Sequence, residues 1–286
     1  STPLYSSAAS DVYKRQNEHR ELTSVYGISL ENRKTLHNED IYSYDDEDLD
    51  VDMLGIKNDK KRKVVSEILN MVHSNKKLNI DKIQNNLYGW KKSQLEFFVD
   101  FETVSDLDDD FTKFPDSGGQ QIIFQIGCGY VEDSNWKFKQ FTTHLLDTES
   151  ELIILDDWFS FMRMVSKTSD YVVYHWSGAE KIHIESAYDN ARNRHPNRQW
   201  PNIFWFDLLK NIFDAEPVTV KGAYGLGLKQ IAKALKRHGA IETTWDNGPT
   251  DGMGAMVGAW RANFLAKEEG LNLAEYDIMK LIGKYN

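Results

Sequence analysis

Short apolar stretches in the second half of the chain have the length and alternation of β-strands. The first begins with the apolar run 97–99, and the third alternates Trp136 and Phe138 with lysines. Strands are therefore predicted over residues 95–103, 121–131, 136–142 and 170–176. The second and third are expected to form a hairpin across residues 132–135.

Apolar residues at helical spacing predict helices around these strands. One amphipathic helix is predicted over residues 64–72, and another over residues 149–164, between the third and fourth strands. Further helices are predicted from residue 180 onward and over residues 228–237. The glycine-rich residues 245–252 are predicted to form a surface loop.

The sequence of the N-terminal part predicts a small helical module. Residues 21–49 contain short helical segments around Gly27 and Ile28, with Leu36 and Ile41 placed to pack. They resemble a helix-hairpin-helix unit, although Ser29 and Leu30 stand where the second hairpin glycine is usual. A small packing or protein-contact module is the alternative to phosphate binding.

The domain organisation expected from these patterns has four parts. Residues 1–16 resemble a translated sequencing-adapter read-through and are expected to be a non-native leader. The helix-hairpin-helix-like module then covers residues 17–58, a helical linker covers 59–92, and the α/β domain covers 93–286.

Composition narrows the function classes. The 286 residues allow about two domains, and no apolar run approaches the roughly 18 residues of a membrane span. The single cysteine, Cys128, cannot form an internal disulfide, which favours a reducing setting. A soluble, cytoplasmic protein is expected. The net charge of −10 requires any contact with nucleic acid to depend on a local basic surface or on metal ions.

Asp100 and Glu102 are the main candidates for chemistry. They follow a predicted buried strand two residues apart, so the strand period places both on one face. Carboxylate oxygens are hard ligands that suit Mg²⁺ or Mn²⁺. The alternative is an ordinary strand end that enters solvent.

Four motifs in order give the chain a resemblance to a known family. They are Val-Asp-Phe-Glu-Thr at 99–103, Val-Tyr-His-Trp-Ser-Gly-Ala-Glu-Lys at 173–181, Trp-Phe-Asp-Leu at 205–208 and Ile-Gly-Lys-Tyr-Asn at 282–286. Residues 94–286 resemble the YprB-type ribonuclease-H-like domain that ends predicted nucleases of the RecB-like family. That domain is similar to the DEDD 3′–5′ exonucleases. The resemblance implies an α/β fold with a ribonuclease-H-like mixed sheet flanked by helices.

A metal-dependent nuclease is the function that the resemblance implies. Asp100 would bridge two Mg²⁺ or Mn²⁺ ions, Glu102 would bind the ion that orients the attacking water, and Glu180 would complete the cluster. Glu180 stands where the family has an aspartate, and its alternative role is that of a helix N-terminal glutamate. Asp207 is a helix cap, an outer carboxylate or a replacement ligand.

The last motif carries the remaining implied residue. Tyr285 matches the tyrosine that positions the water in the DEDDy branch, or it is a core aromatic of the last helix. The family motif continues to an aspartate three residues beyond Asn286. The chain is therefore expected to be a fragment, with a nuclease or helicase-like region upstream.

Basic residues mark two candidate nucleic-acid contacts. Lys229 and Lys233 lie on the predicted helix 228–237, and Arg192 and Arg194 form the second group. Either group is alternatively an ordinary solvated face. The expected partner is DNA or RNA, through single-stranded 3′ ends. The other hypotheses are a catalytically impaired nucleic-acid-binding or regulatory module and a hydrolase of small phosphorylated molecules.

Overall fold

The computed structural model describes residues 20–80, 83, 95–104, 121–167, 170–176, 184–242 and 252–285. The chain divides into two compact units. The first unit contains Ser1–Gln84 and Leu209–Thr244, and the second contains Asn85–Leu208 and Trp245–Asn286. Each unit is described by itself.

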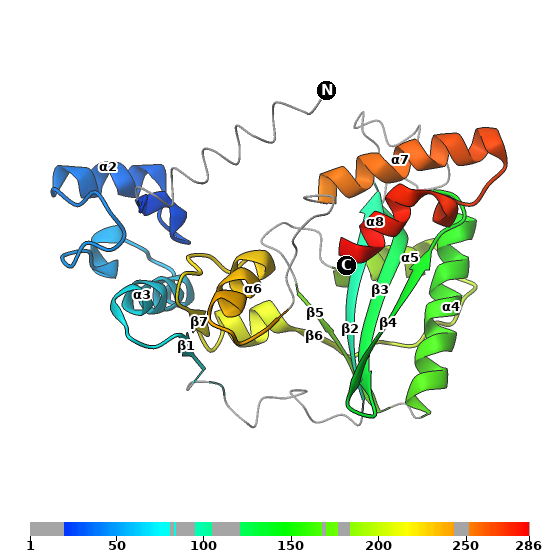
Figure 1. The fold of residues 1–286 in the computed structure, drawn as a ribbon, viewed down its shortest axis with the longest axis horizontal. Coiled ribbons are helices and arrows are strands. Elements are labelled where there is room, and N and C mark those ends of the chain that lie inside the picture. The colour runs from blue at the N-terminus through cyan, green and yellow to red at the C-terminus, as the bar shows by residue number, and fades with distance from the viewer. Residues whose placement is uncertain are drawn as a thin grey trace. The chain divides into compact units, whose positions relative to one another are not determined.

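The second unit is a five-stranded mixed sheet with helices on both faces (Figure 1). Its elements are β2 (Leu95–Val104), β3 (Ile122–Glu132), β4 (Asn135–Thr142), α4 (Thr148–Ser166), β5 (Tyr171–His175), α5 (Ile184–Arg194), β6 (Trp205–Asp207), α7 (Gly252–Glu269), η5 (Leu273–Glu275) and α8 (Asp277–Tyr285). The strand order is β4-β3-β2-β5-β6. The pairs β4–β3 and β3–β2 are antiparallel, and β2–β5 and β5–β6 are parallel.

The predicted strands and the α/β class are confirmed. The hairpin closes with Glu132 opposite Asn135, as its turn residues predict. β2 is the middle strand of the sheet, between β3 and β5. Its register with β3 shifts between Glu102 and Thr103, which marks a β-bulge.

Two hydrophobic cores cover the two faces of this sheet. Side chains of α4 and α5, among them Trp158 and Tyr188, pack with Phe97 and Val99 of β2 on one face. On the other face, α7 and α8 pack with Val104 at the far end of the same strand. Every strand residue can therefore be assigned to a face by its position in the alternation.

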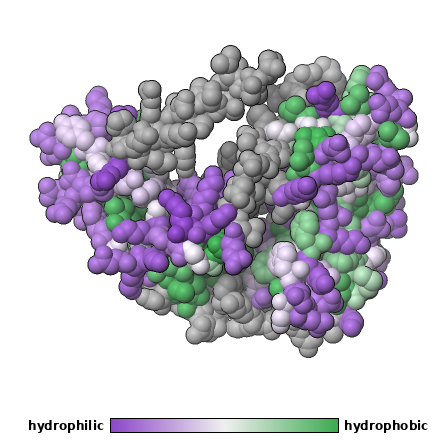
Figure 2. Space-filling model, viewed as in Figure 1, coloured by the Kyte–Doolittle hydropathy of each residue, from purple (hydrophilic) through white to green (hydrophobic). Residues whose placement is uncertain are grey.

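The first unit is mostly helical. Its elements are η1 (Leu22–Ser24), α2 (Leu30–Asn38), η2 (Val51–Leu54), α3 (Asp59–His73), β1 (Leu78–Asn79), η4 (Leu209–Asp214), β7 (Thr219–Val220) and α6 (Leu228–Arg237). β1 pairs with β7 in a two-stranded antiparallel sheet. Hydrophilic residues cover most of the face of this unit seen in Figure 2, whereas hydrophobic residues reach the surface more often over the second unit.

Ser29 begins a helix instead of replacing a hairpin glycine. Its side chain accepts a hydrogen bond from the Asn32 N–H, and the Asn32 side chain accepts one from the Ser29 N–H, which together form a capping box. Between residue 20, where the described part of the chain begins, and Ser29, the structure contains only the three-residue turn η1, so two full helices do not flank Gly27 within the described residues. Leu36 and Ile41 are buried, as predicted.

Two segments pack differently from the expected domain organisation. Val64 and Val65 of α3 are fully buried in the core of the first unit, so this helix is part of a domain and not a linker. Tyr224 and Leu226 pack against the same core, although the sequence analysis placed them in the range 93–286. Within the described ranges, no helix combines the length and apolar character needed to cross a membrane.

Candidate functional site

Asp100 and Glu102 lie on the middle strand of the second unit's sheet. Because Phe97 and Val99 point into the core formed with α4 and α5, alternation along β2 places the two carboxylates on the opposite face. This is the face that α7 and α8 partly cover. We call it the carboxylate face.

The neighbouring strand leaves room beside Asp100. The residue opposite Asp100 on β3 is Gly127, which has no side chain, and the residue opposite Glu102 is Gln125. The Gln125 side-chain amide donates to the carbonyl of Met279 in α8, at 3.4 Å. Helix α8 therefore covers the Glu102 end of the pair, while no side chain of β3 stands beside Asp100.

The two carboxylates differ in their exposure to water. Glu102 is only 7% exposed, whereas Asp100 is open to solvent. The protein around the middle of the sheet nevertheless removes much of the bulk water near Asp100, and this desolvation raises its pKa from 3.8 to about 6. A hydrogen bond from the Phe101 N–H acts in the opposite direction. A raised pKa at an accessible carboxylate is typical of a functional site.

The third predicted ligand position is only partly described. Glu180 lies outside the described residues, and so does the side chain of Tyr285, whose backbone ends α8. Asp207 ends β6 opposite His175, and both are buried. Alternation from Val173, which lies in the core with α4 and α5, puts Asp207 on the face opposite Asp100. Its position therefore does not support Asp207 as a ligand beside Asp100 and Glu102. The helical turn Leu209–Asp214 begins shortly after it, so the role of a helix cap stays a prediction.

The basic residues predicted to contact nucleic acid belong to two different units. Lys229 and Lys233 lie on α6 of the first unit, where Lys233 is exposed and Lys229 is half-buried. Arg192 is exposed on α5 of the second unit and lies over the Tyr188 ring, 5.8 Å from its centroid. Lys229, Lys233 and Arg192 stay candidates for a nucleic-acid contact, and the exposed Lys233 and Arg192 are the more accessible.

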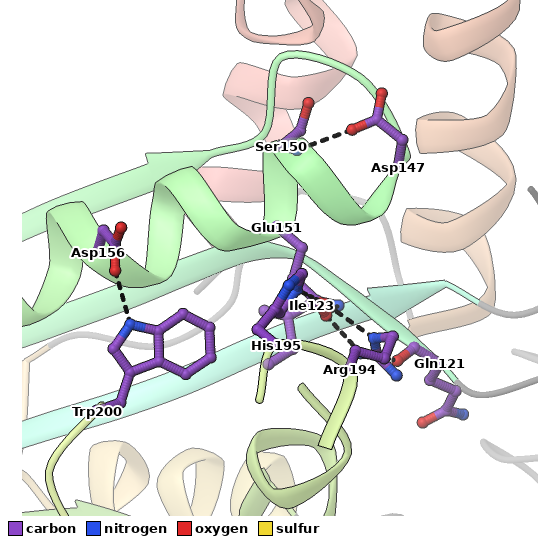
Figure 3. Close-up of polar contacts among 9 residues, drawn as sticks. All are labelled: Gln121, Ile123, Asp147, Ser150, Glu151, Asp156, Arg194, His195 and Trp200. Atoms are coloured by element: carbon purple, nitrogen blue, oxygen red, sulfur yellow. Dashed lines mark hydrogen bonds and ion pairs between the residues drawn. The ribbon is translucent and has the colours of Figure 1, made fainter. Parts of the chain in front are cut away.

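Arg194 is a structural residue, which corrects its prediction as a surface contact. Its guanidinium group donates to both oxygens of Glu151, at 2.6 and 3.0 Å, and to the carbonyl of Gln121 at 2.7 Å (Figure 3). The Arg194 and Glu151 side chains are 8% and 0% exposed. A guanidinium group held in this way cannot reach a phosphate at the surface.

Two further groups lie within hydrogen-bond distance of the Glu151 carboxylate in the same buried cluster. The Ile123 N–H donates to its carboxylate at 2.8 Å, and the His195 Nε2 lies 3.2 Å from it. Figure 3 shows these groups converging from α4, β3 and the end of α5. The cluster therefore joins the end of α5 to the start of α4 and to the sheet.

The carboxylate pair offers two oxygen donors to a cation, and the described ranges contain no group of three His, Cys, Asp or Glu residues placed to hold one. Trp136 and Phe138 on β4 are exposed on the same face and were predicted only as strand residues. Their alternation with lysines is the sequence signal that could have marked them. No protein-family model matches the chain, and none of the curated proteins matches it.

Proposed function

We propose that the second unit is a metal-dependent phosphodiesterase that hydrolyses DNA or RNA as a 3′–5′ exonuclease. The observation that carries this proposal is the placement of Asp100 and Glu102. They are adjacent on one face of the middle strand, and Asp100 is open to solvent at a point where its pKa is raised. Paired carboxylates on a rigid strand are a suitable base for binding divalent cations.

The topology of the sheet supports a ribonuclease-H-like fold. Three antiparallel strands in sequence are followed by two parallel strands, and α4 and α5 precede β5 and β6. This is the element order that the resemblance implies. Topology alone does not decide chemistry, because one fold hosts many activities. The carboxylate pair is therefore the stronger support.

The donor set fits a hard divalent cation. Asp100 and Glu102 would hold Mg²⁺ or Mn²⁺ through carboxylate oxygens, and Gly127, opposite Asp100, adds no side chain at that position. A bound cation would supply charge stabilisation and activation of water for phosphodiester hydrolysis. The protein itself concentrates negative charge at one point and keeps one side of it accessible.

A catalytically impaired nucleic-acid-binding module is the second candidate. It is favoured by the observation that the described residues supply only two neighbouring donors for the cation. Such a module would still bind a polynucleotide but would cleave it slowly or not at all. A hydrolase of small phosphorylated molecules would have the same site without a preference for chain length.

Metal removal tests the proposal. The chain is expected to shorten a 5′-labelled single-stranded oligonucleotide stepwise when Mn²⁺ or Mg²⁺ is present, and to stop when EDTA is added. Cleavage should return when excess Mn²⁺ is restored. Products would be resolved on a denaturing gel, with a dinucleotide and p-nitrophenyl phosphate as short substrates.

Each other outcome selects another function. Binding without shortening, at any metal concentration, would favour the impaired module. Equal rates on the short and long substrates would favour the small-molecule hydrolase. Cleavage that persists in EDTA would contradict a metal-dependent mechanism.

A further inference from the structure

A β-bulge places two consecutive residues of β3 on the carboxylate face. Glu102 lies opposite Gln125, but the next residue of β2 lies opposite Ile123. Phe124 is therefore the extra residue of β3. Its side chain packs into the core formed with α7 and α8, and the Gln125 side chain donates to α8 from the same face. The bulge thus adds a buried amide beside Glu102 and keeps an aromatic side chain in that core.

The Gln125 side chain is a fully buried donor. Its Nε2 donates to the Thr142 hydroxyl oxygen at 3.1 Å and to the Met279 carbonyl oxygen of α8 at 3.4 Å. The Gln140 Nε2 donates to the same hydroxyl oxygen at 2.9 Å. A buried amide nitrogen has two hydrogens that need acceptors, and here one acceptor is on β4 and the other is on α8. Gln125 therefore joins the middle of the sheet to α8.

Gly283 lets the last turn of α8 approach β4 closely. The residue is buried, and the three atoms nearest to a Cβ added there all belong to the Gln140 side chain. Such a Cβ would overlap the Gln140 amide, so the backbone of α8 lies directly against that amide. Glycine weakens a helix relative to alanine, and the close contact gives a physical reason for its presence here.

The two contacts of α8 follow the positions of the carboxylates. Glu102, Gln125 and Thr142 share one row across β2, β3 and β4. Asp100 of β2 and Gln140 of β4 belong to the row two residues along. Helix α8 contacts the first row near its start and the second near its end, so it passes from the Glu102 row to the Asp100 row. A displacement of α8 would therefore alter the surroundings of the carboxylate pair.

Glu102 needs support from its surroundings more than Asp100 does. A glutamate has one more side-chain torsion than an aspartate, so ordering its carboxylate costs more conformational entropy. Side chains directly opposite each other on antiparallel strands have Cβ atoms about 4.5–5.5 Å apart, which places Gln125 against Glu102. Both residues are buried. A neighbour that is itself held by hydrogen bonds limits the orientations in which Glu102 can present its oxygens to a cation.

We propose that Gln125 is a positioning residue of the cation site, an inference that rests on the proposed function. By holding α8 over the Glu102 row, its amide keeps the Glu102 carboxylate in one orientation beside Asp100. Gln125 acts through its neighbours, because its amide nitrogen donates to Thr142 and Met279. Its loss should therefore weaken the binding of the cation and leave the binding of the polynucleotide unchanged.

Mn²⁺ binding without a polynucleotide tests this inference. Isothermal titration calorimetry would compare the unmodified chain with Gln125→Met, which keeps most of the side-chain length and removes the amide. Ile126→Val is the matched control, because Ile126 is the next residue of β3 and is fully buried in the core on the other face. We expect Gln125→Met to raise the Mn²⁺ dissociation constant about tenfold, the size typical of losing a residue that supports a metal ligand. Ile126→Val should lower the Tm and leave the dissociation constant unchanged.

Gly283→Ala perturbs α8 at its other contact. The added methyl group should also raise the Mn²⁺ dissociation constant, and the further change Gln140→Ala should restore the affinity by removing the overlapped amide. A double variant that binds Mn²⁺ more weakly than Gly283→Ala would contradict the role of this contact. In cleavage, Gln125→Met should raise the Mn²⁺ concentration that gives half the maximal rate and leave the KM for the oligonucleotide unchanged.

The outcomes separate this inference from the proposed function. Asp100→Asn should remove the Mn²⁺ binding of the unmodified chain, and binding that persists in this variant, or that is absent from the start, would overturn both. Equal dissociation constants for the unmodified and Gln125→Met chains, with binding that still requires Asp100, would overturn only the inference. A rise that Ile126→Val shares would also overturn it, because destabilisation alone would then explain the effect.

Discussion

Replacing Arg194 by alanine is expected to destabilise the second unit by about 3–5 kcal/mol, the cost of leaving one partner of a buried ion pair without the other. Glu151 is fully buried, so its carboxylate would lose the bidentate partner in a place that water does not reach. The corresponding fall in Tm is roughly 10 °C for a unit of this size. Scanning calorimetry would measure it.

Arg192→Ala is the matched control, because it removes the same side chain two residues away. Arg192 is exposed and its guanidinium group lies over the Tyr188 ring. Loss of such an exposed cation–π contact should lower the stability by less than about 1 kcal/mol. The double change Glu151→Leu with Arg194→Met should recover part of the lost stability, since no unpaired charge is left. Equal Tm values for Arg192→Ala and Arg194→Ala would contradict the structural role of the buried pair.

Replacing Asp100 by asparagine should abolish cleavage and, at neutral pH, stabilise the fold. Loss of a metal ligand is expected to lower the rate by at least about a hundredfold, since charge stabilisation by a metal is worth several kcal/mol. The stability gain follows from the pKa of Asp100, which folding raises from 3.8 to about 6. Between these pH values the folded chain holds a proton that the unfolded chain has lost. The stability contributed by this proton is therefore lost as pH rises to about 6.

The pH dependence of the Tm difference tests whether the raised pKa of Asp100 causes the gain in stability. In EDTA, Asp100→Asn should melt at the same temperature as the unmodified chain near pH 4 and at a higher temperature at pH 7.5, because asparagine cannot ionise. Glu132→Gln, an exposed carboxylate at the end of β3, should show no such difference. A Tm gap for Asp100→Asn that is constant with pH, or that has the opposite sign at pH 7.5, would contradict the raised pKa. Undiminished cleavage would remove Asp100 from the site.

Much of the second unit's fold could be predicted from the sequence. The apolar residues of its strands and of most of its helices recur at the regular spacing of those elements. The β3–β4 hairpin follows from its alternation and turn. In the first unit, the helix α6 was predicted with its observed bounds. α7 was missed because it begins at the last residue of a stretch predicted to be a loop. It packs through small residues, Ala255, Ala259, Ala262 and Ala266, whose weak hydrophobic signal conceals their helical spacing.

The candidate site likewise contains residues whose placement could be predicted from the sequence and residues whose placement could not. The two-residue spacing of Asp100 and Glu102 predicts one shared face, because side chains alternate along a strand and this needs only three consecutive residues. Arg194 could not be assigned from sequence, since its partner Glu151 lies 43 residues away and looks like an ordinary first-turn glutamate of a helix. Asp207 was grouped with the carboxylates by motif order, but the parallel pairing of β6 puts it on the other face.

The pairing of β1 with β7 has a consequence for the order in which the protein can form. Leu78–Asn79 is made early, but its partner Thr219–Val220 follows all five strands of the larger sheet in the sequence. During synthesis, the sheet of the second unit can assemble while the first unit still lacks η4, β7 and α6. The N-terminal unit is therefore completed only after the strands of the larger sheet have been made, and a chain stopped before residue 209 would leave part of the hydrophobic core of that unit uncovered.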